Sequence, residues 1–253
     1  MQDHIRKVLI GREVDEFENC TRALNGCIVK NTSAKAAADM ALWDLYGQLH
    51  KIPVYKLLGG ARKSIVTDIT ISVNDPEEMA RDAIDAVKRG YDCLKVKVGS
   101  NPALDVARLA AIRAAVPKDI CVRIDANQAW KPKEAVRILN EMQEKGLDIE
   151  FVEQPVTAHD FEGLKYVTER SYVPVLADES VFSPEDALKI MQMGAGSCKH
   201  QTHEMRRHHQ CAENCFRCGG LWCGVHDRLH AGGQDQRYSS GAPCLCKTDH
   251  HKD

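Results

Sequence analysis

The sequence predicts an α/β protein with a parallel sheet. Short β-branched runs alternate with helix-like stretches at an interval of about 25 to 30 residues, the length of one strand-helix unit. The chain of 253 residues is long enough to bury a sizeable core. Five such units form either most of an open sheet or the first five units of a (β/α)₈ barrel, and periodicity alone does not choose between them.

The first 60 residues contain one clear helical pattern. It opens at Asn31, Thr32 and Ser33, which are favourable capping residues. Apolar residues follow at helical spacing, namely Ala37, Met40, Ala41, Leu45 and Leu49. We therefore expect an amphipathic helix in a first domain that spans residues 1–60 and ends at two glycines.

The repeating units make up a second expected domain, residues 61–195. Its predicted strands are 66–73, 93–98, 120–124, 149–152 and 173–176. Helical patterns lie between or after them at 76–89, 102–115, 132–145 and 184–193. Proline stands at their starts, where the first turn of a helix accepts it.

Residues 196–253 have a different composition. They contain 7 of the 11 cysteines and 8 of the 11 histidines, but only 6 of these 58 residues are Val, Ile, Leu, Met or Phe. That fraction is well below the ~20% under which a segment struggles to bury enough apolar surface to fold. We expect this third segment to be non-native and disordered.

Charge and hydropathy exclude several functions. Lys and Arg total 34 against 36 for Asp and Glu, so nothing calls for a nucleic acid partner. No stretch approaches the roughly 20 apolar residues of a membrane span, and the first four residues do not begin a signal peptide. We expect a cytoplasmic protein without membrane or nucleic acid partners.

Charged residues end consecutive predicted strands at matching positions. Lys97, with Lys95 two residues before it, is followed by Asp125, Glu153 and Asp178 at intervals of 28, 28 and 25 residues. In a barrel these strand ends converge on one mouth, so three carboxylates would meet beside at least one ammonium group. Carboxylate oxygens select a hard divalent cation such as Mg²⁺.

A structural role is the alternative for each of these residues taken singly. An acid after a strand is usually a helix cap or a solvated loop residue, and two lysines two positions apart on a strand simply share a face. Asn127 beside the first acid and Gln154 beside the second favour a metal site instead.

Four strand-end motifs resemble those of the muconate-lactonizing subgroup of the enolase superfamily. They are Lys-Val-Lys-Val-Gly at 95–99, Arg-Ile-Asp-Ala-Asn-Gln at 123–128, Val-Glu-Gln-Pro at 152–155 and Ala-Asp-Glu-Ser at 177–180. Within the subgroup, the chain is most similar to dipeptide epimerases of the L-Ala-D/L-Glu type, over about residues 30–195. The resemblance implies a partial (β/α)₈ barrel, its first five units, preceded by a remnant of an α+β capping domain.

The resemblance also implies an activity, a Mg²⁺-dependent 1,1-proton transfer at the carbon alpha to a carboxylate, via an enediolate. Lys97 would be the catalytic base, and the like charge of Lys95 would help to lower its pKa. The metal ligands would be Asp125, Glu153 and Asp178. Asn127 and Gln154 would lie next to these ligands and support them without binding the metal. The substrate would be a dipeptide, and the residues that bind it are not identified.

Inversion of configuration needs a second acid/base on the opposite face. In the epimerases this is a lysine of the sixth strand, in a stretch resembling Asn-Ile-Lys-Leu-Met-Lys, whereas this chain has Gly-Ser-Cys-Lys-His-Gln at 196–201. Read one base later, the codons of residues 199–204 can encode the missing motif, and those of 222–244 can encode further epimerase-like stretches. We hypothesise a frameshift near residue 196 and little or no epimerase activity of this polypeptide.

Two other functions stay open. Muconate cycloisomerase and o-succinylbenzoate synthase share the acids and lysines named above. The resemblance implies that specificity in the group depends largely on the lid and the eighth strand, and we expect both to be missing here. A non-catalytic fragment with a zinc-binding tail is the other alternative, although its spacings form no clean pair of Cys-x-x-Cys knuckles. Its ligands would come from Cys211, Cys215, Cys218, Cys223, His208, His209 and His226. An incomplete barrel is also compatible with a homo-oligomer.

Overall fold

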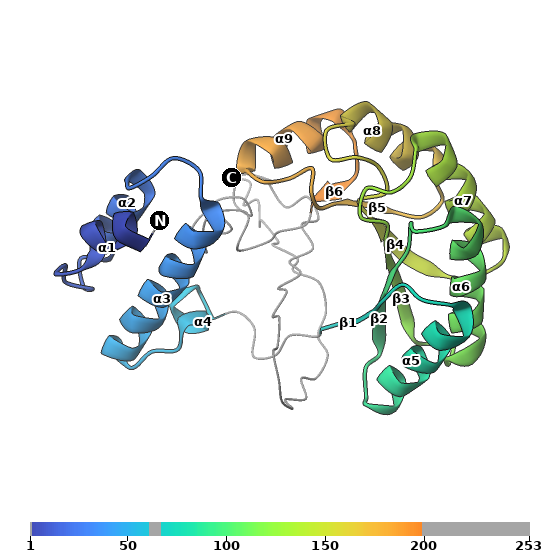
Figure 1. The fold of residues 1–253 in the computed structure, drawn as a ribbon, viewed down its shortest axis with the longest axis horizontal. Coiled ribbons are helices and arrows are strands. Elements are labelled where there is room, and N and C mark those ends of the chain that lie inside the picture. Colours follow the sequence, from blue (N-terminus) through green and yellow to red (C-terminus); the bar gives the residue numbers. More distant parts are fainter. Residues whose placement is uncertain (1, 61–66, 199–253) are drawn as a thin grey trace, which may run out of the picture.

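The computed structural model describes residues 2–60 and 67–198 (Figure 1). The expected zinc ligands, the frame-shifted motif from residue 199 onward and the start of the first predicted strand lie outside the described residues. The N-terminal part consists of helices α1 (Gln2–Leu9), α2 (Phe17–Gly26), α3 (Thr32–His50) and α4 (Val54–Leu57). None of the helices in the described part combines the length and hydropathy that a membrane span requires.

The second part is a curved parallel sheet with helices on its outer side (Figure 1). Its strands are β1 (Ile69–Ile71), β2 (Cys93–Lys97), β3 (Cys121–Asp125), β4 (Ile149–Glu153), β5 (Val175–Ala177) and β6 (Ser197–Cys198). The helices that follow the first five strands are α5 (Pro76–Lys88), α6 (Pro102–Ala115), α7 (Pro132–Glu144), α8 (Phe161–Arg170) and α9 (Pro184–Met193).

The strand order decides between the two architectures that periodicity left open. The strands lie in sequence order from β1 to β6, and every neighbouring pair is parallel. A doubly wound open sheet would reverse its order at a switch point, whereas a barrel wall does not. The prediction of a partial (β/α)₈ barrel is therefore confirmed.

The main core lies between the sheet and its outer helices. Leu94 and Val96 of β2 are fully buried, as are Leu109 and Ile112 of α6. Because side chains alternate along a strand, the residues between these apolar ones face the inner side of the sheet. This alternation places the side chains of Lys95 and of its ladder partner Arg123 on the inner side of the barrel wall.

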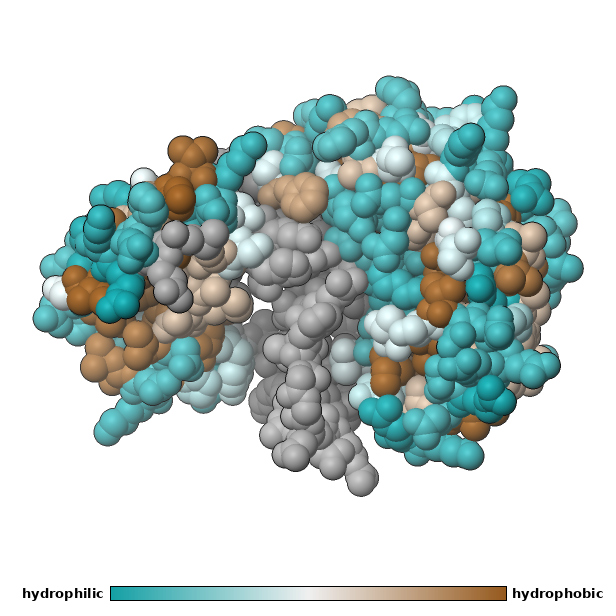
Figure 2. Space-filling view, viewed as in Figure 1, coloured by the Kyte–Doolittle hydropathy of each residue, from teal (hydrophilic) through white to brown (hydrophobic). Residues whose placement is uncertain are grey.

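Helix α3 is present, but its buried face was predicted wrongly. The five apolar residues from Ala37 to Leu49 that define the helical pattern are all exposed, and Figure 2 shows hydrophobic surface over the N-terminal helices. The opposite face packs instead, and Leu42 joins a small core with Cys20 and Leu24 of α2. Asn31 also makes no side-chain cap bond, because it lies in the left-handed region at φ 56°.

The barrel wall continues past the expected boundary at residue 195. Ser197 and Cys198 form β6 and pair in parallel with Leu176 and Ala177 of β5. Backbone groups make this pairing, so it does not require the apolar side chains whose scarcity predicted disorder from residue 196. Helix α8 was not among the predicted helical stretches.

Candidate active site

The charged residues predicted from the motifs end neighbouring strands. Lys97, Asp125 and Glu153 are the last residues of β2, β3 and β4, and the ladder pairs Lys97 with Asp125 and Asp125 with Glu153. Asp178 directly follows the last residue of β5. All four therefore lie at the carboxyl edge of the sheet, where (β/α) enzymes carry their active sites.

Ion pairs join these side chains in a buried environment. The exposed fractions of Asp125, Glu153 and Asp178 are 0%, 2% and 3%. Lys95 Nζ lies 2.7 Å from Asp125 Oδ2 and 2.7 Å from Glu153 Oε2, and Lys97 Nζ lies 2.6 Å from the same Asp125 oxygen. Two ammonium groups thus share one carboxylate oxygen of Asp125, and Asp125 and Glu153 have opposite charges beside them.

Lys95 is held in its charged form. Burial alone would lower its pKa, but the charges of Glu153 and Asp125, and hydrogen bonds to both, raise the pKa above its ordinary value. Lys95 therefore carries a positive charge beside Lys97. The sequence predicted this positive charge of Lys95 near Lys97.

Gln154 connects the end of β4 to the loop that carries Asp178. Its Oε1 accepts hydrogen bonds from the backbone N–H groups of Asp178, at 2.8 Å, and Ser180, at 3.2 Å. Its Nε2 donates to Ser180 Oγ at 2.8 Å and to the carbonyl of Val156 at 3.0 Å. All polar atoms of this fully buried amide are thus used to position the loop after β5.

Asn127 links Lys97 to an acid that the sequence reading did not single out. Asn127 Oδ1 accepts a hydrogen bond from Lys97 Nζ, and its Nδ2 donates to Glu179 Oε1 at 2.8 Å. The other oxygen, Glu179 Oε2, is buried and has no hydrogen-bond partner among the described residues. The sequence could have indicated Glu179 by its position, because it directly follows Asp178 in the strand-end motif.

The strand-end loops carry backbone strain at these amides. Asn127 and Gln154 have φ values of 45° and 37°, in the left-handed region that side chains other than glycine rarely occupy. Such residues cost roughly 1–3 kcal/mol each and persist where surrounding contacts hold them. The hydrogen bonds of both side chains supply those contacts.

The residues at this edge fit a divalent cation by charge and donor type. Asp125, Glu153, Asp178 and Glu179 contribute four formal negative charges against two positive ones from Lys95 and Lys97, which leaves the two charges that one Mg²⁺ neutralises. The unpartnered Glu179 oxygen is a further available donor. Within the described part of the chain, Lys95 bridges Asp125 and Glu153, and the three predicted ligands do not form a group with all donor atoms within 4.8 Å.

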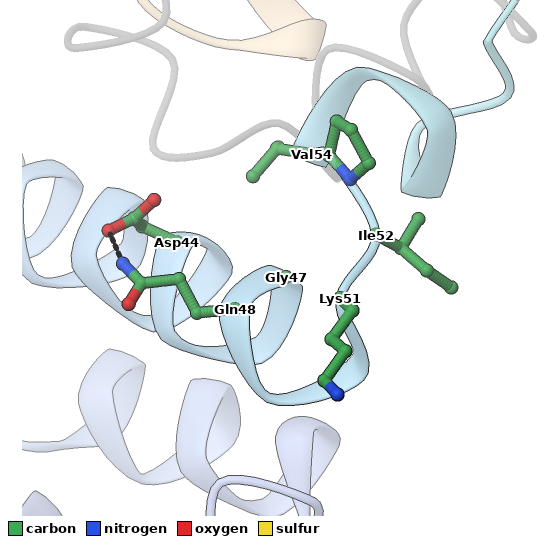
Figure 3. Close-up of a pocket in the computed structure, with 7 residues that line it drawn as sticks. Asp44, Gly47, Gln48, Lys51, Ile52 and Val54 are labelled. Carbon is green, nitrogen blue, oxygen red and sulfur yellow. Dashed lines mark hydrogen bonds between the residues drawn. The ribbon is translucent and has the colours of Figure 1, made fainter.

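A separate surface hollow of about 270 Å³ lies at the end of α3, beside α4 (Figure 3). Its lining residues are Asp44, Gly47, Gln48, Lys51, Ile52, Pro53 and Val54. Gln48 Nε2 donates a hydrogen bond to Asp44 Oδ2 at 2.7 Å across this surface. None of the predicted site residues lines the hollow, so it is not part of the candidate active site.

Comparison with known families agrees with the fold and with the position of the acids. Residues 78–200 match the enolase C-terminal domain-like family, and residues 1–59 match the mandelate racemase / muconate lactonizing enzyme N-terminal domain. A barrel wall with acids at its strand ends, preceded by an N-terminal helical part, and these two family matches together place the chain in the enolase class of proteins. The chain belongs to the mandelate racemase and muconate lactonizing enzyme group of the enolase superfamily.

Similar curated proteins are named epimerases or racemases. The chain is 56% identical over 195 residues to the L-Ala-D/L-Glu epimerase of Clostridium acetobutylicum, a match covering 77% of this chain and 54% of the relative. It is 48% identical over 188 residues to the hydrophobic dipeptide epimerase of Enterococcus faecalis, covering 74% and 52%. The chain therefore spans about half the length of the curated relatives it matches.

Solved structures show the same fold. The substrate-liganded complex of the Bacillus subtilis L-Ala-D/L-Glu epimerase has a TM-score of 0.81 at 40% identity, covering 88% of this chain and 62% of that one. The dipeptide epimerase of Enterococcus faecalis, complexed with Mg and L-Leu-L-Tyr, has a TM-score of 0.82 at 37% identity, covering 89% and 65%. Both of these proteins are named epimerases, a class of isomerases.

Proposed function

We propose that this chain is part of a Mg²⁺-dependent dipeptide epimerase, which moves a proton at the carbon alpha to the substrate carboxylate. The carrying observation is the row of Lys97, Asp125 and Glu153 at adjacent strand ends, continued by Asp178. The names of the relatives support dipeptides over muconates as the substrate class.

The proposed division of labour separates charge from proton transfer. Asp125, Glu153 and Asp178 would hold the cation, which supplies charge stabilisation for the substrate carboxylate. Lys97 would hold or accept the α-proton at Nζ. In the structure, Lys97 Nζ donates hydrogen bonds to Asp125 Oδ2 and to Asn127 Oδ1, which hold it beside the proposed ligands.

We propose that the chain transfers the α-proton on only one face of the substrate. Residues 1–60 would be the capping-domain remnant and 61–195 the part of the barrel that carries the metal site. The residues after Ala195 do not spell the lysine motif that serves the opposite substrate face. We therefore expect exchange of the α-proton without efficient inversion.

Isotope exchange tests this function directly. With Mg²⁺ in D₂O, we expect the α-hydrogen of the C-terminal residue to exchange in one diastereomer of Ala-Glu, followed by proton NMR. Lys97→Ala should slow the exchange about 100-fold or more, since a positioned base contributes at least that much. The exposed Lys118→Ala should leave it unchanged.

Three outcomes would contradict the proposal. Absence of exchange in both diastereomers would exclude the function, and exchange that survives Lys97→Ala would exclude the assigned base. Rapid inversion by the wild-type chain would exclude the need for the second lysine.

A further inference from the structure

A second cluster of reactive side chains lies at the opposite end of the strands that carry the candidate active site. Cys93 and Cys121 are the first residues of β2 and β3, and Glu150 is the second residue of β4. One donor atom from each of the three lies within 4.8 Å of the other two. Lys97, Asp125 and Glu153 are at the other, carboxyl ends of these strands.

The register of the sheet explains why these three side chains meet. Cys93 and Cys121 are directly paired in the ladder, so their side chains point to the same face. Between β3 and β4 the register shifts, because Val122 pairs with Ile149 but Ile124 pairs with Val152. This bulge adds one residue to β4, and Glu150 Oε2 accepts a hydrogen bond from Cys121 Sγ at 3.0 Å.

The buried thiol of this cluster, Cys93, is neutral rather than nucleophilic. The hydrogen bond with Cys121, together with burial, raises the pKa of Cys93 far above its ordinary value. A protonated thiol is a poor nucleophile, so a catalytic role is disfavoured for Cys93. The cluster is nevertheless reachable, because exposure rises from the buried Cys93 through Cys121 to the exposed Glu150.

The charges around the two thiols allow a divalent cation to bind if each thiol loses its proton. Arg123 donates hydrogen bonds to Glu150 Oε2 and, at 3.1 Å, to Asp68 Oδ2, so two acids and one guanidinium leave one net negative charge. A divalent cation that displaces one proton from each thiol leaves that net charge unchanged. Arg123 therefore does not prevent binding by charge alone.

We propose that Cys93, Cys121 and Glu150 form a site for a thiophilic divalent cation of the Zn²⁺ type. Two metal–sulfur bonds form as two S–H bonds break, both protons pass to solvent, and no redox change occurs. Two thiolates, one carboxylate and one water make up the four ligands that zinc prefers. The bound ion would tie the amino ends of β2, β3 and β4 together.

The test uses Cd²⁺ as the probe, because cadmium bound to thiolates has a charge-transfer absorption that carboxylate sites lack. In the full chain, the seven cysteines from residue 198 onward are first replaced with Ser, so that they cannot contribute to the cadmium–thiolate band. We expect this background protein to bind one Cd²⁺ with the thiolate band. Cys93→Ser with Cys121→Ser should abolish the band, whereas the matched Cys20→Ser with Cys27→Ser should retain it.

Glu150→Gln keeps the experiment decisive if the double cysteine variant fails to fold, as judged by circular dichroism. This exposed substitution should keep the band but weaken Cd²⁺ binding about tenfold or more, since losing even an outer partner of a metal ligand costs that much. No band in the background protein, a band that survives in a folded Cys93→Ser and Cys121→Ser variant, or unchanged affinity of Glu150→Gln would overturn the proposal.

Discussion

At the scale of single residues, Lys95 organises the candidate active site. It contacts Asp125 and Glu153 at once, and it comes from a third strand. Burying two carboxylates costs several kcal/mol per ion unless opposite charges and hydrogen bonds compensate. Lys95 supplies that compensation from the inner face of β2, whereas the side chain of Lys97, at the strand end, is more exposed to solvent.

Asp178 provides a test of the proposed metal site. We expect Asp178→Asn to lower the affinity for Mn²⁺, used as a spectroscopic substitute for Mg²⁺, about tenfold or more, because the ion loses one anionic ligand. Electron paramagnetic resonance titration measures the unbound ion. Glu169→Gln, at an exposed position on α8, is the matched control, and equal affinities of the two variants would argue against Asp178 as a ligand.

At the scale of elements, the loops after β2 and β3 are locked to each other. Asp105 of α6 is fully buried and accepts hydrogen bonds from the Gly99 N–H at 2.9 Å and from Trp130 Nε1 at 3.4 Å. Arg108 Nη1 compensates its charge at 3.1 Å. These contacts hold in place the loops that directly follow Lys97 and Asp125.

Gly99 lies where the loops after β2 and β3 come close together. Its φ is 102°, and an added Cβ would lie 2.4 Å from Ala129 Cβ and 2.9 Å from the Ala126 carbonyl oxygen. We expect Gly99→Ala to lower the free energy of unfolding by roughly 1–3 kcal/mol beyond the loss in Gly90→Ala, because the added methyl group overlaps packed atoms; urea denaturation measures the difference. Gly90 has a similar φ of 92° but nothing within 4 Å of an added Cβ, so equal losses would show that the contact is unimportant.

At the scale of the whole molecule, the described chain is an arc of six parallel strands rather than a closed barrel. One end of its strands carries the acid and lysine cluster, and the other end carries the two thiols and Glu150. The homo-oligomer that an open sheet allows stays a prediction. So does the frameshift near residue 196.

The gene itself tests the frameshift. We expect the nucleotide sequence after the codon of Ala195 to spell Asn-Ile-Lys-Leu-Met-Lys in the neighbouring frame, because the shifted codons allow that motif. A chain restored to that frame should then epimerise Ala-Glu, and replacing its sixth-strand lysine by Ala should abolish inversion. Third codon bases that do not encode the motif would disprove the hypothesis.

Much of the fold was predictable because its signals are local. The helices at 102–115 and 184–193 have the predicted bounds, since proline, helical spacing and chain breaks lie within each segment. The strand-end positions of the acids follow from the same repeat. Helix α3 was harder: its sequence is apolar on the exposed face, and only the packing of α2 on the other face determines what is buried.

The sequence by itself determined the α/β repeat, the family, and the placement of Lys97, Asp125, Glu153 and Asp178 at strand ends. Only the tertiary structure decided that Lys95 bridges two acids, that Glu179 has a buried oxygen without a partner, and that two thiols meet Glu150 at the far end of the strands. The physical reason is that periodicity acts over a few residues. These contacts join residues about 30 to 60 positions apart, so they depend on strand register and on one bulge that no local pattern encodes.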